Sequence, residues 1–158
     1  MQKLFENWRS YLNEGAPSQA AIDVAIDKAR EEDPHPYEED YLVELTKEVA
    51  KLAGYITSRA GASARTMATW SEKLISFPWS REFRQKLERN LGGSRGGRVA
   101  IRTGGWAIVF ASVLEALDDY TAIFNNNETV ANYNRQQLIG DYRVLYNFLK
   151  SMLIDINK

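Results

Sequence analysis

Residues 106–124 read WAIVFASVLEALDDYTAIF, the most apolar helical pattern in the 158-residue chain. Large apolar side chains recur there at steps of four and three residues, which is the spacing of the buried seam in a helical bundle. The seam residues are Trp106, Phe110, Val113, Leu117, Tyr120 and Phe124. A helix with such a stripe must bury it against other helices, so we expect this helix to form the centre of the core.

Two further segments have the same spacing of apolar residues. The seam residues are Leu42, Leu45, Val49, Leu52 and Ile56 in the first segment, and Leu138, Tyr142, Leu145, Leu149, Met152 and Ile156 in the second. Three long helices with one period predict an all-α fold, an antiparallel helical bundle with left-handed packing. The long helices are 37–60, 105–124 and 128–156. Shorter helices, one of them capped by Ser18, are expected to pack around them.

A glycine- and arginine-rich segment, GGSRGGRVAIRTGG, occupies residues 92–105 and contains six of the ten glycines. Its arginines precede the predicted start of the central helix, where free backbone N–H groups and the helix dipole favour an anion. The segment lacks the Gly-Lys-Ser/Thr end of a P-loop. Two interpretations stay open: a phosphate-binding segment, or a flexible connection whose arginines pair with acidic neighbours. A short strand at residues 99–101 is the only β signal.

Charge is distributed unevenly along the chain. The net charge is −6 over residues 1–58, +7 over residues 59–105 and −2 over residues 106–158. Arginine suits phosphate recognition because its planar fork is always charged and can bind two oxygens at once. The middle block therefore predicts contact with nucleic acid or an acidic protein, unless the acidic first third neutralises it internally. The candidate anion-binding residues are Arg81, Arg84, Arg89, Arg95, Arg98 and Arg102.

Composition argues against several kinds of chemistry. The chain has no cysteine, which excludes disulfides, zinc thiolate sites and a cysteine nucleophile. His35 is the only histidine and lies between two prolines, a poor basis for a metal site or a Ser-His triad. No apolar run is long enough to span a membrane. We therefore expect a non-enzymatic binding or structural protein with no metal ion, no cofactor and no membrane partner.

The pair Glu115 and Asp118 resembles the second half of the acidic motif of the all-α nucleotide pyrophosphohydrolases, helical bundles that bind magnesium between facing helices. The first half, Glu-x-x-Glu on the preceding helix, is missing, because Glu44 and Glu48 are four residues apart. A magnesium-dependent nucleotide hydrolase remains one alternative function. Another is a helical interaction adaptor that self-associates as a homo-oligomer, since Tyr and Trp are enriched at interfaces.

The first fourteen residues, MQKLFENWRSYLNE, place their apolar side chains on one helical face. They resemble the amphipathic leader peptides of proteins packaged inside the heads of T-even-type tailed phages and their marine relatives. In that family a prohead protease cuts after Leu/Ile-x-Glu before a small residue, and Leu12, Asn13 and Glu14 are followed here by Gly15. The resemblance implies a removable leader at 1–14, a single helical-bundle domain at 15–158, and localisation in the virion or host cytoplasm. The alternative is an N-terminal helix that docks on the bundle.

Overall fold

Most of the described chain is helical. The computed structural model describes residues 4–13, 18–30, 42–58, 64–90, 109–124 and 133–156. The helices are α1 (Leu4–Asn13), α2 (Gln19–Arg30), α3 (Leu42–Ser58), α4 (Ala64–Ser76), α5 (Arg81–Asn90), a helix over residues 109–124, and α7 (Arg135–Ile156). No strand occurs in these ranges, which confirms the all-α class. The strand predicted at residues 99–101 lies outside them.

The 109–124 helix and α7 form the centre of the core, as their apolar spacing predicts. Phe110, Val113 and Leu117 are fully buried in the 109–124 helix. In α7, Leu145 and Leu149 are fully buried as well. Burying apolar surface is the main favourable term in folding, so these two faces supply much of the stability.

Polar side chains set where the shorter helices and α7 begin. Ser18 caps α2 as predicted, because its Oγ accepts a hydrogen bond from the backbone N–H of Ala21 at 3.1 Å. α7 begins with a reciprocal capping box. The Asn134 side chain accepts from the N–H of Gln137, and the Gln137 side chain accepts from the N–H of Asn134, both at 2.9 Å.

This capping box corrects one predicted boundary. We expected the last helix to begin near Glu128, but Tyr133 and Asn134 are non-helical and the helix begins at Arg135. Several residues between 125 and 134 can cap a helix, so composition alone does not select the cap. Asn134 is selected because Gln137 stands three residues later and can complete the box.

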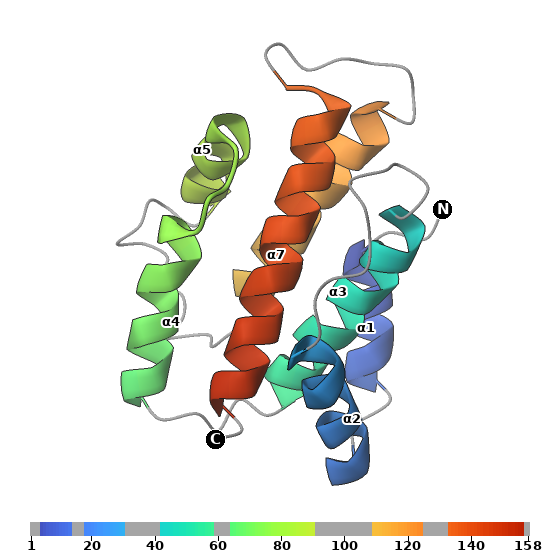
Figure 1. The fold of residues 1–158 in the computed structure, drawn as a ribbon. Helices are drawn as coiled ribbons and strands as arrows, with labels where there is room; N and C mark the ends of the chain where they lie inside the picture. The colour runs from blue at the N-terminus through green and yellow to red at the C-terminus, as the bar shows by residue number, and fades with distance from the viewer. Residues whose placement is uncertain are drawn as a thin grey trace.

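The helices around α7 run in different directions (Figure 1). α4 is antiparallel to α7. Trp70, early in α4, donates its Nε1–H to Asp155 near the end of α7 at 2.7 Å. Phe77, just after α4, contacts Phe148, which comes earlier in α7, with ring centroids 5.1 Å apart. The 109–124 helix also runs opposite to α7, whereas α3 runs in the same direction. The antiparallel arrangement therefore holds for two of the neighbours of α7, and the left-handed crossing stays a prediction.

α1 is docked on α3 and on the 109–124 helix. Leu4 is fully buried and Trp8 is only 4% exposed. The indole Nε1 of Trp8 donates to Thr57 Oγ1 at 3.4 Å, and the backbone N–H of Leu4 donates to Asp118 Oδ1 at 2.9 Å. Both apolar and polar contacts thus hold α1 in the core. No helix of the described chain has the length and apolarity that crossing a membrane requires.

Replacing Trp8 by alanine should lower the free energy of unfolding by about 3–5 kcal/mol, the usual cost of deleting a buried large aromatic side chain. Urea denaturation followed by circular dichroism measures this change. Ser10→Ala, on the exposed face of the same helix, is the control and should change stability by less than about 0.5 kcal/mol. An unchanged unfolding midpoint in Trp8→Ala would contradict the docking of α1.

Candidate nucleic-acid interface

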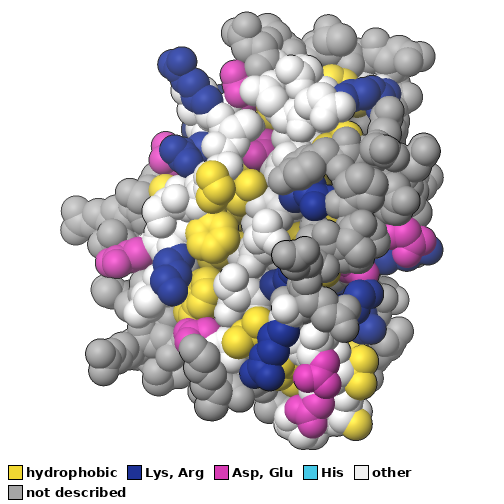
Figure 2. All heavy atoms as spheres, in the orientation of Figure 1, with side chains coloured by type: hydrophobic (Ala, Val, Ile, Leu, Met, Phe, Trp, Pro, Cys, Tyr) yellow, Lys and Arg dark blue, Asp and Glu magenta, His cyan; other side chains and the backbone are white. Residues whose placement is uncertain are grey.

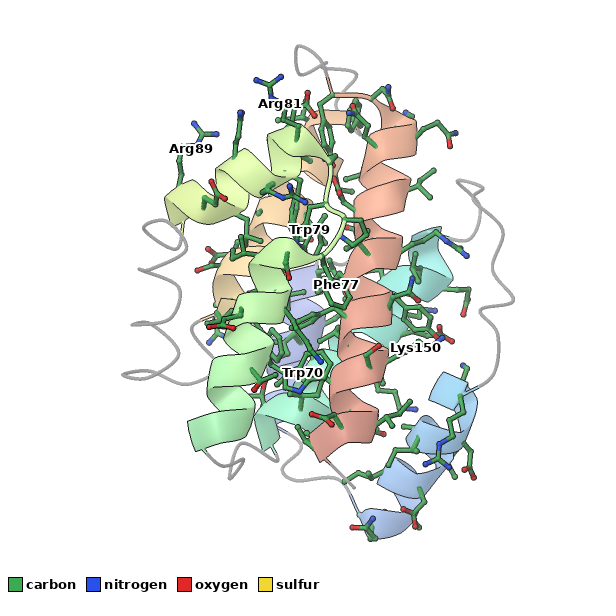
Figure 3. All side chains as sticks on the ribbon, turned by 60° about the vertical axis from the view of Figure 1, so that its left-hand side comes forward. Trp70, Phe77, Trp79, Arg81, Arg89 and Lys150 are labelled. Carbon is green, nitrogen blue, oxygen red and sulfur yellow. The ribbon has the colours of Figure 1, made fainter. Side chains whose placement is uncertain are left out.

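α5 presents a row of long polar side chains to solvent. Arg81, Gln85 and Arg89 follow each other at steps of four residues and are all exposed. Residues four apart lie one above the other on a helix, so the three side chains share one face. Figure 3 shows Arg81 and Arg89 projecting outward from α5, away from the body of the molecule. We call Arg81, Gln85 and Arg89 the basic row.

The opposite face of α5 anchors it to the core. Phe83 and Leu87 are fully buried, and Trp79, just before the helix, is only 5% exposed. The Trp79 and Phe83 rings contact each other with centroids 4.9 Å apart, and Trp79 Nε1 donates to the carbonyl of Leu74 at 2.6 Å. These contacts hold the basic row on a rigid support, which reduces the entropy cost of binding.

A buried carboxylate in α7 fixes the start of α5. Asp141 is 1% exposed and accepts three hydrogen bonds. Ser80 donates its backbone N–H at 2.8 Å and its hydroxyl at 2.6 Å, and the Tyr133 hydroxyl donates at 2.9 Å. Ser80 also caps α5, since its Oγ accepts from the N–H of Phe83 at 3.3 Å. One carboxylate therefore joins α7 to the chain entering α5.

Burial and hydrogen bonding act in opposite directions on this carboxylate. Burial raises the pKa of Asp141 because the charged form loses its hydration, and the hydrogen bonds from Ser80 and Tyr133 lower the pKa in part. The pKa of Tyr133 is raised as well, first by burial and then by the charge of Asp141. Tyr133 therefore stays a hydrogen-bond donor near neutral pH.

The other basic residues of α5 have structural partners. Arg84 is half-buried, and its Nη2 donates to the carbonyl of Phe77 at 2.8 Å, near the end of α4. Lys86 forms an ion pair with Asp119 at 3.4 Å. Arg84 is therefore not part of the exposed row, although the charge pattern of the sequence placed it in one set of candidates with Arg81 and Arg89.

Several predicted site residues lie outside the described ranges. They are Arg95, Arg98 and Arg102 of the glycine-rich segment, and Glu14 and Gly15 of the cleavage junction. Their roles stay predictions. Trp70 and Trp79, which lie within the basic middle block of the sequence, belong to the core, since they are only 3% and 5% exposed.

The two carboxylates of the proposed hydrolase motif, Glu115 and Asp118, differ in exposure and in hydrogen bonding. Glu115 is exposed, whereas Asp118 is half-buried and accepts the hydrogen bond from Leu4 in α1. Within the described ranges, no group of three or more His, Cys, Asp or Glu side chains is placed to hold a metal ion.

Sequence reasoning missed Asp141, although its position carried a signal. Asp141 comes three residues after Leu138 and four before Leu145, which places it within the apolar stripe of the last helix. A charged residue at such a position is buried and must find donors. The pattern does not identify the donors, because Ser80 is sixty-one residues away in the chain.

No family model matches this chain, and no curated protein or solved structure matches it either. What the protein does must therefore be inferred from its own residues. The basic row on its anchored helix is the feature that carries the inference below.

The raised pKa of Asp141 predicts a specific pH dependence of stability. Because folding raises this pKa above its ordinary value of 3.8, the folded state binds the proton more readily than the unfolded state. The contribution of Asp141 to stability is then largest below that pH and falls as the pH rises. The asparagine side chain of the Asp141→Asn variant has a similar shape and does not titrate.

We therefore expect wild-type stability to fall relative to that of Asp141→Asn as the pH rises from 3.8 toward neutrality. Urea unfolding of both proteins across this range measures the difference. Two curves that run parallel over the whole range would show that folding does not raise this pKa.

Proposed function

We propose that this protein is a non-enzymatic nucleic-acid-binding protein whose basic row contacts the phosphate backbone. The observation that carries the proposal is the exposure of Arg81 and Arg89 on one face of a helix whose opposite face is anchored in the core. Guanidinium groups can bind two phosphate oxygens at once, and a helix that is already ordered adds no backbone-ordering cost to that contact.

The spacing of the row supports a backbone contact. Arg81 and Arg89 are eight residues apart, so their α-carbons are separated by about 12 Å along the helix axis. This is close to the width of the B-DNA major groove, about 12 Å. Gln85 lies between them and adds an uncharged donor, a residue type that also contacts phosphates.

Two acidic side chains near the row have polar partners of their own. Glu82 accepts a hydrogen bond from the Gln137 side chain at 3.1 Å, on the side of α5 that faces α7. Asp119 is paired with Lys86. The neutral Gln137 amide leaves the charge of Glu82 in place, and α5 also contains Glu88. Four basic and two acidic side chains nevertheless give α5 a net charge of +2. Arg95, Arg98 and Arg102 follow α5 in the sequence and stay predicted anion-binding residues.

Replacing Arg81 or Arg89 by glutamine should weaken binding to duplex DNA similarly for all sequences. Each lost phosphate contact should also reduce the slope of log K against log salt concentration by about 1. Fluorescence anisotropy with labelled duplexes at several salt concentrations measures both quantities.

The matched control is Arg30→Gln, which removes an exposed arginine from α2 and should leave both quantities unchanged. If Arg81→Gln and Arg30→Gln had the same affinity and the same slope as the wild type, the basic row would not be the binding surface.

The phage-packaging hypothesis concerns the origin of the chain and stays a separate proposal. It depends on cleavage between Glu14 and Gly15, and mass spectrometry of the mature protein tests it directly, since an intact Met1 would contradict it. Cleavage would detach α1 from the chain, including the buried Leu4 and Trp8. We therefore expect the processed chain 15–158 to unfold at a lower urea concentration than the full chain.

A further inference from the structure

A cavity of about 260 Å³ opens between α2, α3 and α7, on the side of α7 away from α5. Four lysines from three helices line it: Lys28 of α2, Lys47 and Lys51 of α3, and Lys150 of α7. Figure 3 shows Lys150 projecting from α7 toward the side where α2 and α3 lie. Figure 2 shows basic side chains gathered beside hydrophobic ones where α2 meets α7. We call this cavity the lysine pocket.

The charge of the lysine pocket is positive. Two glutamates, Glu44 and Glu48, also line it, so its side chains carry a formal net charge of +2. Glu48 forms an ion pair with Lys28. Within the described chain, Lys47 and Lys51 form no ion pair. They stand four residues apart on one helix, and like charges at this spacing repel each other. An anion bound between them and Lys150 would relieve this repulsion.

Part of the wall of the lysine pocket is apolar. Leu52 is 7% and Tyr146 3% exposed, and the Lys150 ammonium lies 4.9 Å from the centroid of the Tyr146 ring. The rim includes Val24, which is 66% exposed and is the only large hydrophobic side chain of the described chain that is exposed. Exposed apolar surface next to clustered cations suits a ligand with an apolar body and an anionic head.

From these features we infer that the lysine pocket binds a small phosphate monoester with an apolar or aromatic group. A phosphate monoester carries about −1.5 to −2 charges at neutral pH, which matches the net charge of the pocket. Lysine ammonium groups bind phosphate as point charges. The cavity volume lies just below the usual range for small-molecule sites, about 300–1,000 Å³, so the ligand is small.

Phenyl phosphate is the probe, and isothermal titration calorimetry of the full chain is the measurement. We expect saturable binding with one site per chain. Inorganic phosphate, which lacks the apolar group, and benzyl alcohol, which lacks the charge, should each bind at least about tenfold more weakly. No saturable binding of phenyl phosphate, or equal affinity for inorganic phosphate, would overturn the inference.

Lys47→Gln and Lys51→Gln should each weaken phenyl phosphate binding by about tenfold, because each removes one charged contact from an exposed side chain that the fold does not need. Lys73→Gln is the matched control. Like Lys150, Lys73 places its ammonium over an aromatic ring, 4.3 Å from the Trp70 ring centroid. Lys73 lies on α4, outside the pocket. Equal affinities in Lys51→Gln and Lys73→Gln would overturn the assignment of the pocket.

This inference is independent of the nucleic-acid proposal, because α2 and α5 lie on opposite sides of α7 (Figure 1). Arg81→Gln should leave phenyl phosphate binding unchanged. If Arg81→Gln weakened phenyl phosphate binding as much as Lys51→Gln does, the ligand would be bound by general positive charge, and the lysine pocket would be rejected as its site.

Discussion

The buried carboxylate of Asp141 constrains where α5 and α7 begin, and the orientation of the basic row depends on this constraint. A charged group in an apolar interior is strongly destabilising unless donors surround it. Its donors come from Ser80, which begins α5, and from Tyr133, which precedes α7. Satisfying one carboxylate therefore fixes where the chain enters two helices. The direction of the basic row follows from a hydrogen-bond network made on the opposite side of α5.

α7 lies between the two proposed sites (Figure 1). On one side, Trp70 and Phe77 of α4 pack edge-on against Phe148, with ring centroids 5.4 and 5.1 Å away. On the other side, α2 and α3 approach α7 and leave the lysine pocket between them. The two sides differ because aromatic rings fill the first interface, whereas long lysine side chains border the second and keep their charged ends near water.

Local patterns predicted much of the fold and part of the candidate site. The apolar spacing identified the buried faces of the 109–124 helix and α7, because burial repeats with the helical turn. The start of the last helix was misplaced, because the cap depends on the pairing of Asn134 with Gln137 and not on asparagine content. The charge pattern grouped Arg81, Arg84 and Arg89 together as anion-binding candidates. The structure leaves Arg81 and Arg89 exposed and engages Arg84 with the carbonyl of Phe77, a partner that a charge pattern does not show.

The sequence by itself determined the helical class, the faces that are buried and the basic character of α5, since each depends on residues within a few turns of one another. Only the tertiary structure decided which charged groups meet. Ser80 reaches Asp141 across sixty-one residues, and Lys28, Lys51 and Lys150 converge from three helices. The physical reason is that helical periodicity is a local property, whereas the lateral packing of helices depends on contacts between segments far apart in the chain.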